Sequence, residues 1–325
     1  MPAFDHALDW TRRHVRSGAL PTAVLGVADA SGVVALEAFG EASADDHYPL
    51  FSITKPLVGL AALELVEQGR LATTTPLGAA LPGFRRAEEV QLRHLVSHSS
   101  GIVEAPMDQP ELRRTLLAAD SDFAPGTATR YSTLAFEGVA ALIEHASGEP
   151  WERRVLELTR RAGADGVTFD HESTRHAPVD AAAFGLDWER FSTLRHPGAG
   201  AFARASDLLA LGSSLLRNDG RTVSPLAVEA MRRPLTEGLT KLEPFTEDRG
   251  QEWGFAWNLL VRAPGLLARD TFGHAGWAGT QFWITPSLGV CFVLLTNRPD
   301  PAQFGIVIDE LQNAVGGAAS RRALD

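Results

Sequence analysis

The sequence predicts an α/β fold, more narrowly α+β, in which one antiparallel sheet built from both chain ends is flanked by helices and carries an inserted all-helical domain. The first observation is that β-prone runs occur before residue 40 and again beyond residue 252, whereas the chain between them is mainly helical with long loops. The second is that 45% of the 325 residues are apolar, enough for a large core in a two-lobed molecule. We expect a sheet domain from residues 1–68 and 248–325, a helical domain from residues 69–247, and a small-molecule site in the cleft between them.

The N-terminal elements follow from local patterns. Apolar residues recur at helical spacing before Gly18, which predicts a first helix. Two β-prone runs at 22–28 and 33–38 surround a turn and predict a hairpin. The next segment, 52–68, is rich in apolar residues and is followed by Gly69, which predicts a largely buried helix with a glycine stop.

The rest of the chain gives a coarser prediction. Periodicity and turn residues predict helices at 90–98, 134–146, 206–217 and 301–315, and strands at 253–261, 280–284 and 290–295. The polar stretches at 162–180 and 235–250 show no clear period.

Composition excludes several classes of partner. With 40 acidic and 30 basic residues the chain carries a net charge of −10, which disfavours nucleic acid as the main partner. One cysteine, Cys291, excludes a disulfide framework and a multi-cysteine metal site. No apolar run is long enough for a membrane span, and charged residues interrupt residues 1–18, so we expect no signal peptide and a cytoplasmic location.

Lysine is nearly absent, since 28 of the 30 basic residues are arginine and the lysines are Lys55 and Lys241. Lys55 lies three residues after Ser52 at the start of the buried helix, so the two side chains can meet at a helix N-terminus that offers free N–H groups. A buried lysine can have its pKa lowered enough to accept a serine proton. The alternative is a helix-capping serine and a solvated lysine; the apolar surroundings favour the chemical interpretation. Lys241, in a polar stretch, is predicted to be an ordinary surface residue.

Two other segments bring candidate groups. Tyr131 lies just before a predicted helix and could take the proton of Ser52, although a tyrosine there could equally anchor a loop. His274 lies in a glycine-rich segment, 272–280, and could donate to a carboxylate or carbonyl; the alternative is a turn with a surface histidine.

Together these segments resemble the serine β-lactamase and penicillin-binding protein superfamily, whose signature includes Ser-x-x-Lys. The closer similarity is to the branch of class C β-lactamases, D-alanyl-D-alanine carboxypeptidases, D-aminopeptidases and related carboxylesterases. Further segments at 93–101, 125–132 and 295–298 match that branch in the right order, so the resemblance covers roughly residues 20–300. It implies a β-lactamase/transpeptidase-like fold with the site between the sheet and the helical domain.

The resemblance also implies residue roles. Ser52 would be the nucleophile, Lys55 its proton-shuttling neighbour and Tyr131 the general base. The oxyanion hole would be formed by the backbone N–H groups of Ser52 and Trp277.

Two positions depart from the family pattern. Thr133 stands where β-lactamases and peptidases have asparagine after the tyrosine, and this variation is similar to the esterase members. His274, followed by Ala275 and Gly276, takes the place of the lysine in the Lys-Thr-Gly strand and would hold a substrate carboxylate less firmly. Both departures argue against strong β-lactamase activity.

His94 and His98 are four residues apart, a spacing that can place two imidazoles on one helix face to bind zinc. Without a third ligand the pattern favours helix packing and capping, and we predict neither a metal nor a cofactor. The sequence thus predicts a serine hydrolase acting on small esters through an acyl-enzyme, with a rate that rises into alkaline pH. D-amino-acid amides, peptides or β-lactams are the alternative substrates, a catalytically idle scaffold is the non-enzymatic alternative, and the oligomeric state is not predicted.

Overall fold

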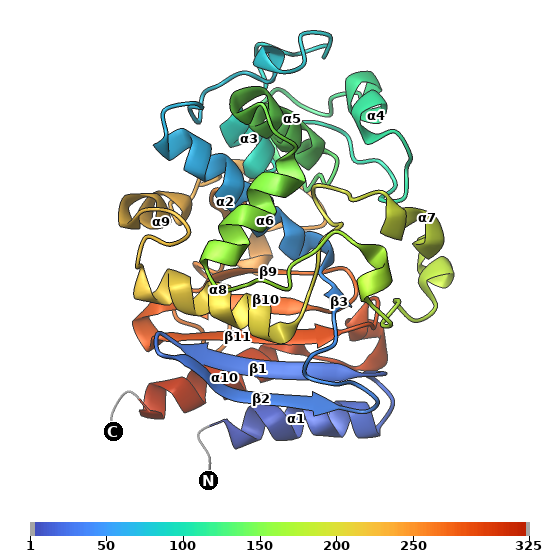
Figure 1. The fold of residues 1–325 in the computed structure, drawn as a ribbon, viewed down its shortest axis with the longest axis vertical. Helices are drawn as coiled ribbons and strands as arrows, with labels where there is room; N and C mark the ends of the chain where they lie inside the picture. Colours follow the sequence, from blue (N-terminus) through green and yellow to red (C-terminus); the bar gives the residue numbers. More distant parts are fainter. Residues whose placement is uncertain (1–3, 323–325) are drawn as a thin grey trace.

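A seven-stranded antiparallel sheet forms the base of the molecule in the computed structural model, which describes residues 4–322 (Figure 1). The strand order is β2-β1-β11-β10-β9-β8-β7. The strands are β1 (Ala23–Asp29), β2 (Gly32–Phe39), β7 (Glu252–Trp253), β8 (Asn258–Leu259), β9 (Phe272–Ala275), β10 (Gln281–Thr285) and β11 (Val290–Thr296). This arrangement confirms the predicted fold class.

The two ends of the chain meet in the middle of this sheet. β1 pairs with β2 through the predicted hairpin and with β11 on its other side, where Ala23 lies opposite Thr296. β1 and β11 are buried along nearly their whole length, which explains why both read as continuous apolar runs rather than alternating ones.

Helices cover both faces of the sheet. On one face, α1 (Asp5–Arg16) and α10 (Ile308–Arg322) pack side by side, joined by a hydrogen bond from Trp10 Nε1 to Glu310 at 2.9 Å. On the other face, α8 (Ala205–Arg217) crosses β1 and β11. The close approach of α8 depends on Gly212, since a Cβ there would lie 2.5 Å from the sulfur of Cys291.

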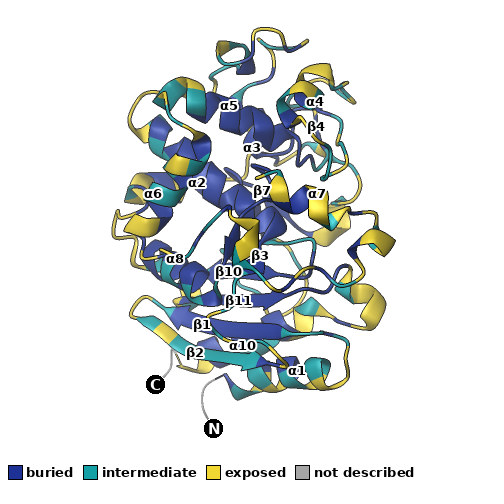
Figure 2. Cartoon of the chain, turned by 45° about the vertical axis from the view of Figure 1, so that its right-hand side comes forward, coloured by how far each residue is buried: buried dark blue, intermediate teal, exposed yellow. Residues whose placement is uncertain are grey.

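The helical lobe is organised around α2 (Thr54–Glu67), which packs against α5 (Ala135–Ser147) and α6 (Trp151–Arg161). Figure 2 shows α2 and α5 as buried through most of their length. A helix with buried residues on most of its sides is stable only when surrounded, as α2 is over Thr54–Leu63. The other α-helices are α3 (Leu92–Val96), α4 (Leu112–Ala118), α7 (Trp188–Thr193) and α9 (Pro225–Met231).

Short elements link the two parts. β3 (Tyr48–Pro49) pairs with β5 (Phe202–Ala203), and β4 (Ala128–Thr129) runs parallel to β6 (Thr240–Lys241). The 3₁₀ turns are η1 (Phe51–Ile53), η2 (Leu77–Ala79), η3 (His171–Ser173), η4 (Ala181–Phe184), η5 (Glu247–Arg249), η6 (Pro286–Leu288) and η7 (Pro301–Phe304).

Several sequence-based expectations need correction. The single strand predicted at 253–261 is wrong: Ala256, with φ of +67°, breaks it into β7 and β8. The last helix does not span 301–315, because η7 ends at Gly305 with φ of +73° before α10 begins. Helices α4, α6, α7 and α9 were not predicted, and α8 packs on the sheet although it lies inside residues 69–247. The boundaries of the two domains stay a prediction.

Lys241 is the clearest error, since it is not an ordinary surface residue. Its side chain is only 4% exposed, and Nζ forms ion pairs with Glu252 at 2.9 Å and Glu247 at 2.7 Å. Glu252 is itself buried and also pairs with Arg262, so the lysine balances a carboxylate inside the protein. Among residues 4–322, no helix has both the length and the apolarity that crossing a membrane requires.

We expect Gly212→Ala to lower the free energy of unfolding by about 1 to 2 kcal/mol. The added methyl overpacks the contact with Cys291, which outweighs the gain of about 1 kcal/mol in helix propensity. Urea unfolding followed by circular dichroism measures the change. Ser206→Ala, in the first turn of the same helix, is the control and should stay within about 0.5 kcal/mol of wild type. A Gly212→Ala variant more stable than wild type would contradict this account of the packing.

Candidate active site

Ser52 lies in η1, at the point where the chain turns from the sheet into α2. The preceding residue, Phe51, has φ of +47°, a conformation that non-glycine residues rarely adopt. Its buried ring holds this turn in place, packing against Phe191 with ring centres 5.1 Å apart and against Trp277 at 5.2 Å. The strained backbone thus presents Ser52 at the junction of the two lobes.

Lys55 is completely buried in the first turn of α2. Its Nζ donates to Ser52 Oγ at 3.0 Å, to Thr133 Oγ1 at 3.3 Å and to the Gly198 carbonyl oxygen at 2.9 Å. Burial lowers the pKa of Lys55 to about 7, with the charge of Glu104 acting in the opposite direction. A neutral amine has two hydrogens and one lone pair, so in that form Ser52 O–H can donate to Nζ.

Tyr131 lies against Lys55, with Nζ 4.6 Å from the centre of its ring. On its other side it stacks on His98 at 4.2 Å, and the Nδ1 of His98 accepts a hydrogen bond from the Ser132 backbone N–H at 3.1 Å. Burial raises the pKa of Tyr131 far above its ordinary value, so the phenol keeps its proton at neutral pH. Its hydroxyl has no hydrogen-bond partner within the described chain, which leaves it available to a reacting group.

His274 lies on β9, with its ring centre 6.1 Å from that of Tyr131. Nδ1 is 2.7 Å from the carbonyl oxygen of Ala275 and therefore carries the proton. Burial and the nearby Lys55 lower the pKa of His274 to about 3, so the ring is neutral and Nε2 is an acceptor. With the proton on Nδ1, the free Nε2 has no hydrogen to donate to a carboxylate or carbonyl, and the role of His274 toward a substrate stays a prediction.

The turn that follows β9 contacts Leu50, the residue directly before η1, which carries Ser52. Thr280 Oγ1 donates to the carbonyl oxygen of Leu50 at 3.3 Å, and a Cβ on Gly276 would lie only 2.4 Å from that oxygen. Glycine is therefore required at 276 for the turn to reach η1. Across residues 4–322, the backbone N–H groups of Ser52 and Trp277 donate to no acceptor, as an oxyanion hole requires.

The structure brings most of the predicted site together. Ser52, Lys55 and Thr133 are joined by hydrogen bonds, and Tyr131 covers them. The carbonyl of Gly198 was missed, because a backbone acceptor has no residue-type signature. Glu104 was missed for another reason: its link to the site runs through the backbone of residues 133 and 134, which no sequence spacing shows.

His94 and His98 do not form a metal site. His94 Nδ1 accepts from the backbone N–H of Gln91 at 3.2 Å, and His98 is engaged with Tyr131 and Ser132. In the described part of the chain, no group of three or more histidine, cysteine, aspartate or glutamate side chains could hold a metal ion.

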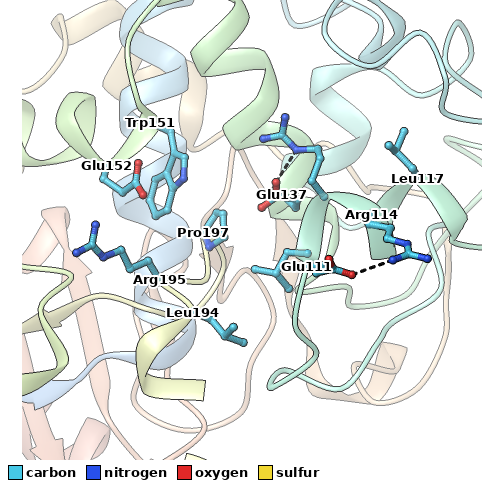
Figure 3. Close-up of a pocket in the computed structure, with 11 residues that line it drawn as sticks. Glu111, Arg114, Leu117, Glu137, Trp151, Glu152, Leu194, Arg195 and Pro197 are labelled. Atoms are coloured by element: carbon cyan, nitrogen blue, oxygen red, sulfur yellow. Dashed lines mark hydrogen bonds and ion pairs between the residues drawn. The ribbon is translucent and has the colours of Figure 1, made fainter. Parts of the chain in front are cut away.

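A separate pocket of about 560 Å³ lies in the helical lobe (Figure 3). Its wall includes Trp151 from α6, Glu137 from α5 and Pro197, and Ser52 does not line it. Pro197 directly precedes Gly198, so this pocket borders the segment that binds Lys55 without opening onto the nucleophile.

The chain is similar to known proteins over most of its length. A family model described as Beta-lactamase matches residues 8–316. Esterase EstB of Burkholderia gladioli is 28% identical over 346 aligned positions, covering 88% of this chain and 86% of that protein. Among solved structures, EstCE1, a hydrolase with promiscuous acyltransferase activity, superposes with a TM-score of 0.78 at 20% identity, covering 97% of this chain and 99% of that one. A penicillin-binding protein homologue from Caulobacter crescentus gives a TM-score of 0.79 at 20% identity and 98% coverage of each chain.

We expect Gly276→Ala to slow the reaction of Ser52 with a fluorophosphonate by about 100-fold or more, while the fold is retained. The new methyl group would meet Thr280 Oγ1 and the Leu50 carbonyl, displacing the Trp277 N–H from the oxyanion position. Mass spectrometry of the labelled protein over time gives the rate. Gly83→Ala, where a Cβ would make only an ordinary contact at 3.9 Å with Leu117 and φ is not positive, should react like wild type. Unchanged labelling of Gly276→Ala would remove Trp277 from the proposed oxyanion hole.

Proposed function

The chain belongs to the beta-lactamase family and is a serine hydrolase, and on that premise we propose that it is a carboxylesterase that cleaves small, uncharged esters through an acyl-enzyme. The observation that carries the proposal is the state of His274. A peptide substrate of this family ends in a free carboxylate, and a neutral acceptor nitrogen at this place repels that group rather than binding it.

Thr133 supports the same conclusion. Its hydroxyl accepts a hydrogen bond from Lys55, and it has no amide nitrogen with which to bind the carbonyl of a substrate amide. A small neutral ester has no carboxylate that a cation of the site must bind and no amide group that needs a hydrogen-bond partner. The similarity to a protein named as an esterase over 88% of this chain agrees with this preference.

In the proposed mechanism, neutral Lys55 takes the proton of Ser52 while Oγ forms a bond to the ester carbonyl carbon. The N–H groups of Ser52 and Trp277 stabilise the negative oxygen. The bond from carbon to the alcohol oxygen then breaks, and that oxygen receives a proton through the hydroxyl of Tyr131, which is replenished from the Lys55 ammonium.

The second half reverses these proton movements. Water gives a proton to Lys55 and bonds to the acyl carbon, and Ser52 Oγ leaves and regains a proton. We therefore assign the base to Lys55, with its pKa of about 7, and the relay to Tyr131, whose phenol burial keeps protonated. The sequence had suggested Tyr131 as the base.

The cytoplasmic location that was expected from the sequence stays a prediction.

We expect Ser52→Ala to abolish hydrolysis of a short-chain p-nitrophenyl ester, with a loss of at least about 10⁴-fold in kcat/KM, because no other hydroxyl replaces the nucleophile. The release of p-nitrophenol measures it. Retained turnover in a correctly folded variant would sink the assignment of Ser52.

A substrate panel separates the esterase from its alternatives. Wild type should cleave neutral short-chain esters at least about tenfold faster than a D-alanyl peptide with a free carboxylate or the β-lactam nitrocefin. A preference for the peptide or for nitrocefin would favour the peptidase or β-lactamase alternative. Failure of all substrates, together with no fluorophosphonate label on Ser52, would favour a catalytically idle scaffold.

The pH profile tests the base. Because burial lowers the pKa of Lys55 to about 7, its reactive neutral fraction grows as pH rises through that value. For a neutral ester, kcat/KM should rise about tenfold per pH unit below about pH 6.5 and level off above about pH 8. Stopped-flow rates between about pH 6 and 9 give the profile, with the solvent-catalysed hydrolysis subtracted. A flat profile over this range would contradict Lys55 as the proton acceptor.

A further inference from the structure

Glu104 binds the backbone of the active-site turn from a distant segment. Its Oε2 accepts hydrogen bonds from the N–H groups of Thr133 and Leu134, the latter at 3.3 Å. These N–H groups lie directly before α5, where a helix leaves donors unsatisfied and where its dipole favours a negative charge. No side chain of the turn itself caps these two N–H groups. The carboxylate of Glu104, which comes from another segment, provides their hydrogen-bond acceptor instead.

The turn that Glu104 holds contains two groups in contact with Lys55. Tyr131 places its ring over Nζ, and Thr133 accepts one of the three hydrogen bonds of that ammonium. The turn is also tightly packed from behind, since a Cβ on Gly198 would lie 2.8 Å from the Thr133 carbonyl oxygen. A shift of the backbone at 133 would therefore move the hydroxyl and the phenol together relative to Ser52.

Glu104 also stands out among the charges around Lys55. The titratable groups that face Nζ come from separate elements: Tyr131, Glu104, His98, His196 and His274, with Ser52 as the hydroxyl partner. Burial lowers the pKa of all three histidines, so they are neutral at pH 7. Glu104 is itself an exposed residue of the loop before α4, and among residues 4–322 its charge opposes the lowering of the Lys55 pKa by burial.

We propose that Glu104 is a positioning residue of this active site, holding the 131–134 turn through its backbone and providing the negative charge that faces Lys55. The inference rests on the roles proposed above for Ser52 and Lys55. It assigns two separable tasks to one side chain: hydrogen bonding sets where Thr133 and Tyr131 lie, and charge sets at which pH the lysine becomes a base.

Three variants separate these tasks. Glu104→Gln keeps an oxygen that can accept from both N–H groups and removes the charge, whereas Glu104→Asp keeps the charge and withdraws it by one methylene. Glu111→Gln is the matched control, because Glu111 lies at the end of the same loop, is largely exposed and forms an ion pair with Arg114. The measurement is the rate of Ser52 labelling by a fluorophosphonate as a function of pH, which does not depend on the natural substrate.

Removing the negative charge lowers the pKa of Lys55, so the neutral amine appears at lower pH. Glu104→Gln should move the midpoint of the acidic limb down by about half a pH unit or more, with a plateau rate within about threefold of wild type. Glu104→Asp should keep the midpoint and lower the plateau by about tenfold, since the turn is no longer held in place. Glu111→Gln should leave both unchanged.

The outcomes distinguish this inference from the proposed function. No labelling of wild-type Ser52 would overturn the proposed function, and this inference with it. If wild-type Ser52 is labelled and the midpoint of the acidic limb is the same in wild type and in Glu104→Gln, the role of Glu104 alone is overturned. If Glu104→Gln does not fold, Glu104→Asp provides the test. A folded Glu104→Asp with both the midpoint and the plateau rate of wild type would overturn the positioning role.

Discussion

The structure depends on the burial of one ammonium group, that of Lys55, at the junction of its two lobes. A charged amine without contact with water is unstable unless each of its hydrogens has an acceptor. Here the acceptors come from three distant parts of the chain: Ser52, Thr133 and the carbonyl of Gly198. The segments that carry these acceptors must therefore hold their relative positions for the lysine to be buried, and the same burial lowers the pKa of Lys55 to about 7.

The surrounding architecture serves this junction. η1 and α2 carry Ser52 and Lys55 from the sheet into the helical lobe, and the buried apolar residues of α2 hold it in place there. The turn after β9 reaches back to Leu50 through Thr280, so the strand that bears His274 is fixed to the segment that bears the nucleophile. The neutral ring of His274 and the hydroxyl of Thr133 thus lie on either side of Tyr131.

The sequence could predict what local chemistry decides. The hairpin of β1 and β2, the buried helix α2 and the pairing of Ser52 with Lys55 all follow from periodicity and spacing within a few residues. It could not predict contacts made by the backbone or across large separations, such as the Gly198 carbonyl or the carboxylate of Glu104. Lys241 shows the same limit, because its polar neighbours in sequence suggest solvent whereas its partner in space is the buried Glu252. The charged helix α6 was missed although Trp151, Val155 and Leu158 recur at helical spacing, and these buried residues pack the helix on its neighbours, α2 among them.

The pairing of β1 with β11 has a consequence for biosynthesis. As the chain leaves the ribosome, the hairpin of β1 and β2 forms early, but the inner edge of β1 stays open until Thr296 and its neighbours emerge to pair with it. Such a long delay is typical of slow folding and leaves an exposed strand edge that other chains can join. The inner edge of β1 therefore has to be shielded from other chains until the residues up to Thr296 have emerged.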